Sequence, residues 1–187
     1  MRWSKLLMIG TVSFFTLPWL LALSTGTAQA QEVRWERIIG LQQAFDLVGV
    51  GKGQVVGGAP WETTEGKARV NLTTGRVKFA VEGLVLAVGS AAGVTFTGLD
   101  IGTPAGVTEV KGTLVCDVNG SAGKGNSVLV DTPSVPLSAQ GDAHFKGNVG
   151  LLPAVCSSEP DIAFLLRIVV PVAFADRWIA AGAVRTP

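Results

Sequence analysis

Residue types that carry chemistry are scarce in this sequence. The chain contains no tyrosine and one histidine, His144. A single histidine excludes metal sites that need two imidazole ligands and leaves one candidate for a histidine general base. No serine has a glycine two residues away on both sides, as a nucleophile elbow requires. The glycine-rich segment 49–53 matches neither phosphate-binding motif. We therefore predict no catalytic residue, metal or cofactor.

Charged residues are also few, at 16% of the chain. Arg2 and Lys5 belong to an expected leader, and without them 13 basic residues face 14 acidic ones, for a net charge of −1. A chain without a basic surplus offers no basis for a nucleic-acid partner or an anionic membrane. The low charge predicts modest solubility or a surface that rests against another component.

The first thirty residues read as an export signal. No acidic residue precedes Glu32, the apolar run Leu6–Leu23 contains the helix breaker Pro18, and the run leads to Ala28-Gln29-Ala30. This is the pattern of a signal peptide with an A-x-A cleavage site. The alternative is an uncleaved anchor, because 18 apolar positions reach the lower limit for a bilayer span.

We expect cleavage after Ala30. Residues 1–30 would then be the signal peptide, and residues 31–187 would form a single exported domain without a stable membrane span. The domain would be secreted, periplasmic or at the cell surface.

Only two cysteines are present, Cys116 and Cys156. In an oxidising compartment an even pair predicts one disulfide, here closing a loop of about 40 residues and contributing on the order of 4 kcal/mol in the chain-entropy model. The alternative, a thiol nucleophile or a metal ligand pair, lacks a second cysteine or a histidine at ligand spacing.

The remaining sequence predicts an all-β fold. Short apolar or alternating runs recur at intervals of roughly ten residues and end in Gly, Pro, Asn or Ser, which is typical of a sandwich or a barrel. We predict a single antiparallel β-sandwich, with a closed β-barrel as the alternative. Besides a hairpin over 68–81, the expected strands are Trp35–Leu41, Ala44–Val50, Leu84–Val88, Val94–Leu99, Val107–Asp117, Ser127–Asp131, Ala143–Val149, Ile162–Val170 and Arg177–Val184.

The hairpin is the clearest unit. Both halves alternate, and placing the apolar residues on one face predicts the pairs Leu72 with Val77, Val70 with Phe79 and Ala68 with Val81.

The same register describes the basic cluster Lys67, Arg69, Arg76 and Lys78. It sets Lys67 opposite Glu82, Arg69 opposite Ala80 and Asn71 opposite Lys78, so that the charges are partly paired on a solvated face. The alternative interpretation is contact with an anionic polysaccharide or another surface polymer.

Two strands have charged residues that need an explanation. Ile162–Val170 is apolar on both faces except at Arg167, so we expect a central strand whose arginine pairs with Asp176 or Asp161. In Val107–Asp117 the face of Val110, Gly112, Leu114 and Cys116 should point inward, with Lys111, Thr113 and Asp117 outward.

Asp142 and His144 would share one face of a strand, where a carboxylate can orient an imidazole for acid–base work or share a metal. Because Ala143 and Phe145 occupy the other face, a solvated pair at a strand start is the alternative. A calcium site from Asp131, Asp142, Glu159 and Asp161 fits no loop motif.

Trp61 follows the loop 57–60, and an aromatic residue on a loop can stack against a sugar ring or an apolar ligand. The alternative is a core position, as for Trp35 and Trp178 in apparent strands.

Residues Gly66 to Val81, where a Gly-Xaa-Ala strand leads into a hairpin, resemble secreted β-domains of the CHRD type. The histidines that mark that family are missing at the next strand, so no site residue is carried over.

Three functions are consistent with these observations. The first is a non-catalytic exported domain with a structural, adhesive or surface-contact role toward an unknown surface component. The second is an extracytoplasmic carrier whose interior holds a small apolar ligand. The third is an extracellular enzyme that uses Asp142 and His144.

Overall fold

A computed structural model describes residues 31–87, 89–91, 94–96, 100–122, 125–158 and 161–186. The expected leader, with its cleavage site after Ala30, lies outside the described residues. Within the described ranges, no helix has the length and apolar character that a bilayer span requires.

Strands dominate the described residues, as expected from the alternating pattern. They are β1 (Glu32–Gly40), β2 (Leu47–Val48), β3 (Val55–Val56), β4 (Trp61–Glu62), β5 (Glu65–Asn71), β6 (Arg76–Glu82), β7 (Val85–Leu86), β8 (Gly89–Ala91), β9 (Val94–Phe96), β10 (Glu109–Cys116), β11 (Val128–Asp131), β12 (Val135–Pro136), β13 (Ala143–Asn148), β14 (Ile162–Val170) and β15 (Trp178–Thr186). The described helices are the short α1 (Ala154–Ser158) and the 3-10 turns η1 (Gly51–Gly53) and η2 (Val172–Phe174).

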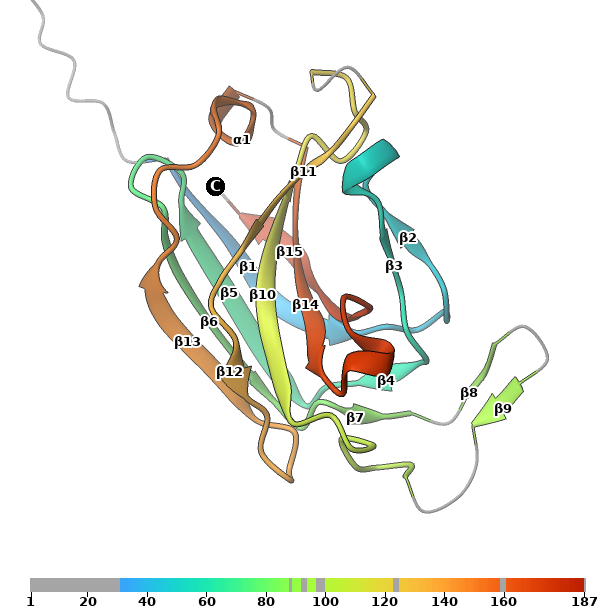
Figure 1. Cartoon of the computed structure of the whole chain (residues 1–187). Helices are drawn as coiled ribbons and strands as arrows, with labels where there is room; N and C mark the ends of the chain where they lie inside the picture. Colours follow the sequence, from blue (N-terminus) through green and yellow to red (C-terminus); the bar gives the residue numbers. More distant parts are fainter. Residues whose placement is uncertain are drawn as a thin grey trace, which may run out of the picture.

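One large antiparallel sheet organises the chain. Its strands follow the order β11-β10-β14-β15-β1-β5-β6-β13, and β12 also pairs with β10. The sheet curls so that β12 and β13, at its two ends, approach each other (Figure 1). The all-β, antiparallel prediction is confirmed, and the main sheet is curled into a half-barrel whose end strands are β11 and β13.

The concave face of the sheet encloses the main core. Alternate residues of β5 and β6 are buried there, as the period of two requires. The ring centroid of Phe164 lies 5.6 Å from that of Trp35 and 5.7 Å from that of Phe79. At Gly112 a Cβ atom would come within 2.9 Å of the Phe79 ring, so glycine is needed for this close packing. The interior is therefore occupied by side chains.

A second, smaller core covers the opposite face of β10, β14 and β15. It consists of Leu41, Val55, Val115, Leu165 and Trp178. The β2–η1–β3 excursion supplies part of this cover (Figure 1).

The second core corrects the expected outward face of β10. Thr113 and Asp117 are both 0% exposed, and Lys111 is half-buried. Alternation alone predicts a solvated outer face, but a strand that is covered on both sides buries both sets of side chains.

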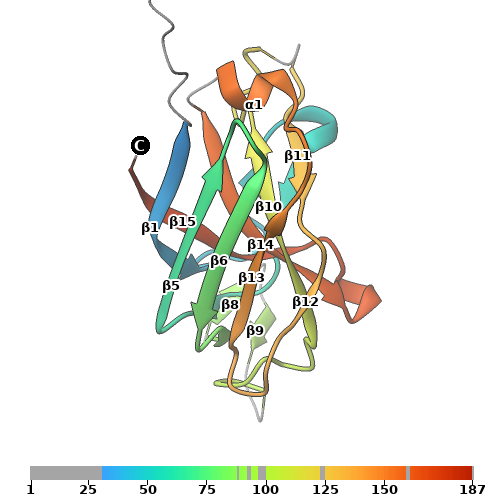
Figure 2. The ribbon, with the colours of Figure 1, turned by 90° about the vertical axis from the view of Figure 1, so that its left-hand side faces the viewer.

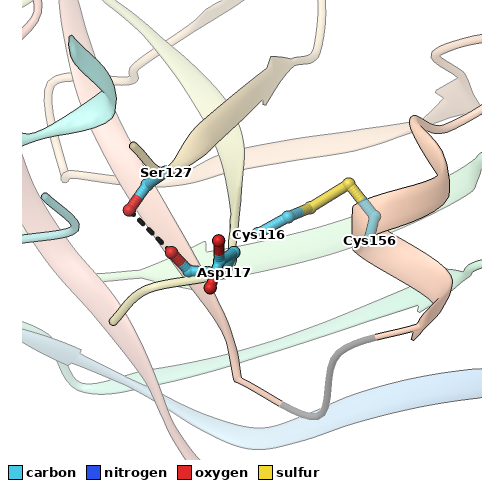
Figure 3. Close-up of a disulfide and its surroundings, with 4 residues drawn as sticks. All are labelled: Cys116, Asp117, Ser127 and Cys156. Carbon is cyan, nitrogen blue, oxygen red and sulfur yellow. Dashed lines mark hydrogen bonds between the residues drawn. A yellow bond between two sulfur atoms is a disulfide. The ribbon is translucent and has the colours of Figure 1, made fainter. Parts of the chain in front are cut away.

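The disulfide between Cys116 and Cys156 is present, with the two Cα atoms 4.9 Å apart. It joins the end of β10 to α1, the short helix that precedes β14 (Figure 3). Beside it, the Ser127 hydroxyl donates to the Asp117 carbonyl at 2.8 Å. The disulfide thus anchors the short helix α1 to the sheet.

The β5–β6 hairpin differs from the predicted register by two residues. Val70 pairs with Val77, and Ala68 pairs with Phe79. Leu72 lies in the turn, where its N–H donates to the carbonyl of Gln31 rather than pairing across the hairpin.

The side chain of Asn71 explains the shift. Its Oδ1 accepts hydrogen bonds from the backbone N–H groups of Thr73 and Thr74, and Gly75 closes the turn with φ +69. This Asx-type turn starts the loop at Asn71. A shift of two residues keeps the buried face unchanged, but it changes every cross-strand neighbour on the outer face.

Candidate functional site

Four basic residues lie directly opposite one another across four neighbouring strands. The register pairs Arg34 of β1 with Arg69 of β5, Arg69 with Lys78 of β6, and Lys78 with Lys146 of β13. We call these four residues the basic row, and all of them are exposed. Like charges at directly opposed positions destabilise a sheet, so the row does not serve the fold.

The basic row crosses the convex face of the curled sheet. In Figure 2, β1, β5, β6 and β13 lie side by side and face the viewer. With neighbouring strands about 4.8 Å apart, four positions span about 14 Å. The row is therefore a short linear array of positive charge on a broad, solvent-facing surface.

Carboxylates neutralise little of this array. Within the described residues, only the Arg34 member of the row forms an ion pair, with its Nε 2.6 Å from Oε1 of Glu32. Toward the other end of β5, Lys67 Nζ lies 3.9 Å from Oε1 of Glu65, which is itself opposite Glu82. The acidic groups of β5 and β6 thus lie at one end of the hairpin, and the middle of the face is positive.

The expected partial pairing of the basic cluster was wrong because it followed the predicted register. Arg69 faces Lys78 rather than Ala80, and Lys67 faces Ala80 rather than Glu82. Asn71 faces Arg76. The two-residue shift therefore replaces compensated charges with an opposed pair of cations.

Two shallow depressions flank the centre of the basic row. One has a volume of about 400 Å³ and includes Arg34 and Lys67, and the other has a volume of about 620 Å³ and includes Arg76 and Lys146. Arg69 and Lys78 line both depressions. An extended ligand that crosses the strands would contact both of these central cations.

Two members of the row, Arg34 and Lys146, are absent from the cluster predicted from the sequence. They lie far from the hairpin in the chain and join it only through strand pairing. The alternation of Arg34 with the buried Val33 and Trp35 signals an outward side chain, but it does not identify the neighbouring strand.

Asp142 and His144 are both exposed, at the start of the edge strand β13. The carboxylate of Asp142 accepts a hydrogen bond from the Gly83 N–H at 3.1 Å. His144 lies opposite Ala80. Asp142 thus supports a loop contact between β6 and β13, and the pair faces solvent as the alternative interpretation expected.

Trp61 lies in the short strand β4, and its side chain is 3% exposed. It belongs to the main core and also forms part of the wall of a rim cavity. Trp35 and Trp178 are likewise buried. The core position is therefore found for all three tryptophans.

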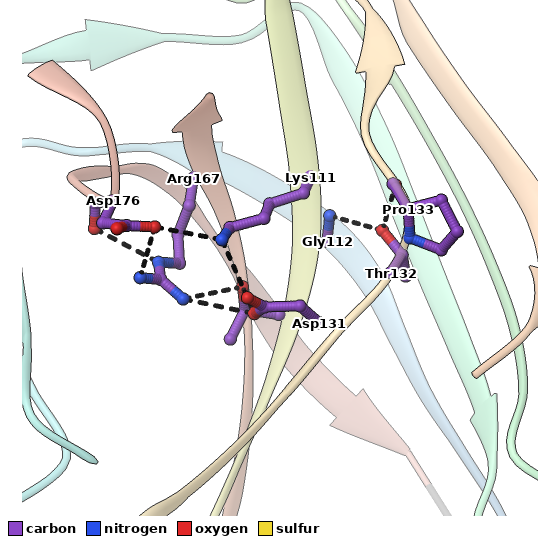
Figure 4. A network of polar contacts seen from close by, with 8 residues as sticks. Lys111, Gly112, Asp131, Thr132, Pro133, Arg167 and Asp176 are labelled. Carbon is purple, nitrogen blue, oxygen red and sulfur yellow. Dashed lines mark hydrogen bonds and ion pairs between the residues drawn. The ribbon is translucent and has the colours of Figure 1, made fainter. Parts of the chain in front are cut away.

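Arg167 belongs to a polar network on β10, β11, β14 and the loop before β15 (Figure 4). Its Nη1 lies 3.1 Å from Asp131 Oδ1, and its Nη2 lies 2.9 Å from Asp176 Oδ1. Lys111 Nζ bridges the same two carboxylates at 2.8 and 3.0 Å. The expected pairing with Asp176 is confirmed, whereas the expected alternative, Asp161, accepts a hydrogen bond from the Asn119 N–H.

The network shifts two pKa values. Burial alone would lower the pKa of Lys111, but hydrogen bonds to Asp131 and Asp176 outweigh burial and raise this pKa above its ordinary value. The hydrogen bond from Lys111 lowers the pKa of Asp176. Both cations form ion pairs with both carboxylates. The cluster therefore has a structural role, because it links β10, β11 and β14 to the loop before β15.

The calcium candidates are not brought together. Among the described residues, no three His, Cys, Asp or Glu side chains are placed to hold a metal ion. Asp131 forms an ion pair with Arg167, and Asp142 accepts a hydrogen bond from the N–H of Gly83. Glu159 lies outside the described residues.

Comparison with protein-family models, curated proteins and solved structures finds no match. The resemblance of the hairpin to CHRD domains therefore receives no support.

Proposed function

We propose that the chain is an exported, non-catalytic β domain that works by contact, and that the basic row binds an acidic polysaccharide outside the cytoplasm. The observation that supports this most directly is the opposition of Arg69 and Lys78 on a solvent-facing sheet. Such an arrangement costs stability and strengthens the attraction for an anion.

The shape of the site favours an extended ligand over a compact one. The cations lie on a broad sheet face and repeat once per strand, at about 4.8 Å. This repeat is close to the length of one sugar ring in an extended chain. A polysaccharide with one acidic group per ring can therefore place successive charges against successive strands.

The disulfide supports the exported location, because such bonds persist in oxidising compartments. Asp142 and His144 face solvent and line neither the two depressions of the basic row nor the cavity beside Trp61. The geometry consequently gives the contact role more support than the enzyme or the interior carrier.

Isothermal titration calorimetry with an oligogalacturonide, whose sugars each carry a carboxylate, tests the proposal. We expect saturable binding at low ionic strength that weakens as salt is added, and no binding of neutral dextran. Lys78→Gln should weaken binding about fivefold, since one charge-assisted contact contributes about 1 kcal/mol.

Lys52→Gln is the matched control, because Lys52 is an exposed lysine in η1, away from the row. It should leave the affinity unchanged. The proposal fails if the unaltered protein does not bind, if both variants weaken binding equally, or if a single-stranded DNA oligonucleotide of equal charge binds more tightly than the oligogalacturonide.

A further inference from the structure

A cavity of about 400 Å³ lies at the rim of the sheet, away from the basic row. It is lined by residues of β4, β7 and β14 and by four loops, which contribute Phe45, Gly58 and Ala59, residues between Asp100 and Val107, and Phe174 with Arg177. Its volume is within the range of about 300–1,000 Å³ that is typical of small-molecule sites. The apolar lining includes Phe45, Trp61, Leu86, Val107, Ile168 and Phe174.

Two aromatic rings stand at this cavity and remain partly in water. Phe45 is 44% exposed, and Phe174 is 59% exposed. Phe45 also has φ +61, a backbone conformation that bulky residues rarely adopt. Local strain of this kind persists when the surrounding structure holds it, and it is concentrated at ligand sites. A ligand in the cavity would cover both rings.

Arg177 gives the cavity a polar group. The residue is half-buried, and its Nη1 donates to the Gly57 carbonyl at 3.2 Å. Its guanidinium carbon lies 5.6 Å from the centroid of the Phe45 ring. Within the described residues Arg177 forms no ion pair, so most of its five donors are available to an anion.

Asp100 also lines the cavity, and it is exposed. If Asp100 determined the charge of the ligand instead of Arg177, its carboxylate would favour a cation. The half-buried position of Arg177 makes its charge the less screened of the two, because interactions of exposed groups are weakened by solvent.

We infer that this cavity binds a small apolar molecule that carries one carboxylate. The apolar part would pack against Trp61 and Phe174, and the carboxylate would accept hydrogen bonds from Arg177. This differs from the interior carrier expected from the sequence, because the interior is filled and the cavity lies at the rim.

Three probes of similar shape test the inference by calorimetry on the purified protein: 2-naphthoate, neutral 2-naphthalenemethanol and cationic 2-naphthylmethylamine. We expect the naphthoate to bind at least tenfold more tightly than the alcohol, and the amine to bind most weakly. Arg177→Gln should abolish the preference for the anion, with Lys52→Gln as its control.

Phe174→Ala should weaken the binding of all three probes by a similar factor. Leu151→Ala, at a leucine that is 89% exposed and does not line the cavity, should change none of them. Urea unfolding of each variant shows whether it is folded under the binding conditions.

Absence of saturable binding, equal affinity for the acid and the alcohol, or tightest binding of the amine would each overturn the inference. Lys78→Gln should bind naphthoate like the unaltered protein, so this result is independent of the proposal for the basic row.

Discussion

Lys78→Glu should make the protein more stable while it removes binding of the acidic polymer. Lys78 lies between two cations, opposite Arg69 on one side and Lys146 on the other. A glutamate at this position would turn two repulsive cross-strand contacts into two attractive ones.

The size of the effect follows from the exposure of these side chains. Two unit charges about 7 Å apart in a water-like dielectric interact with about 0.6 kcal/mol, and physiological salt reduces this to roughly 0.3 kcal/mol. Lys78→Gln removes two repulsions and should stabilise the fold by about 0.6 kcal/mol. Lys78→Glu adds two attractions and should gain about 1 kcal/mol, or about 3 °C in Tm for a domain of this size.

Urea unfolding at low salt and in 1 M NaCl measures the gain. The gain should be largest at low salt and nearly vanish in 1 M NaCl, where the Debye length is about 3 Å. Lys52→Glu, outside the row, serves as the charge-matched control. The reasoning would be refuted if Lys78→Glu were no more stable than the parent at low salt, or if its gain persisted in 1 M NaCl.

Two further predictions concern the structural links. The double variant Cys116→Ala/Cys156→Ala should lose about 4 kcal/mol of the free energy of unfolding, because the disulfide closes a 40-residue separation; a loss below about 1 kcal/mol in urea titrations would contradict this account. Asp176→Asn should cost about 1 kcal/mol at neutral pH. Because the pKa of Asp176 is lowered in the fold, its contribution is present above the ordinary value of 3.8 and is lost as the pH falls through the folded value. The stability gap between parent and variant should therefore shrink in urea titrations as the pH falls below 3.8, and a gap of constant size would count against the network geometry.

The local pattern predicted the fold class and most strand positions. Ile162–Val170 has the predicted bounds, and the inward residues of the hairpin are those expected. The alternation of apolar and polar residues is a property of neighbours in the chain, so it is readable without the structure. The pairing of Arg167 with a carboxylate was also predictable from the sequence, because a charged side chain in an apolar strand must be paired.

The candidate sites were harder to predict from the sequence, because each of them combines residues from segments that are far apart in the chain. The basic row depends on the turn that Asn71 starts, which determines that Arg69 faces Lys78, and on the strand order that adds Arg34 and Lys146. A period of two cannot distinguish registers that differ by two residues, since both bury the same face.

The sequence by itself determined that this chain forms antiparallel strands, most of them with one apolar face, and that its two cysteines would pair. Only the tertiary structure decided which cations stand side by side, that both faces of β10 are buried, and that four loops enclose a cavity around Trp61. The physical reason is that the tendency to form a strand arises from residues adjacent in the chain. Strand register, the burial of both faces of a strand and the cavity depend on contacts between segments that are far apart in the chain.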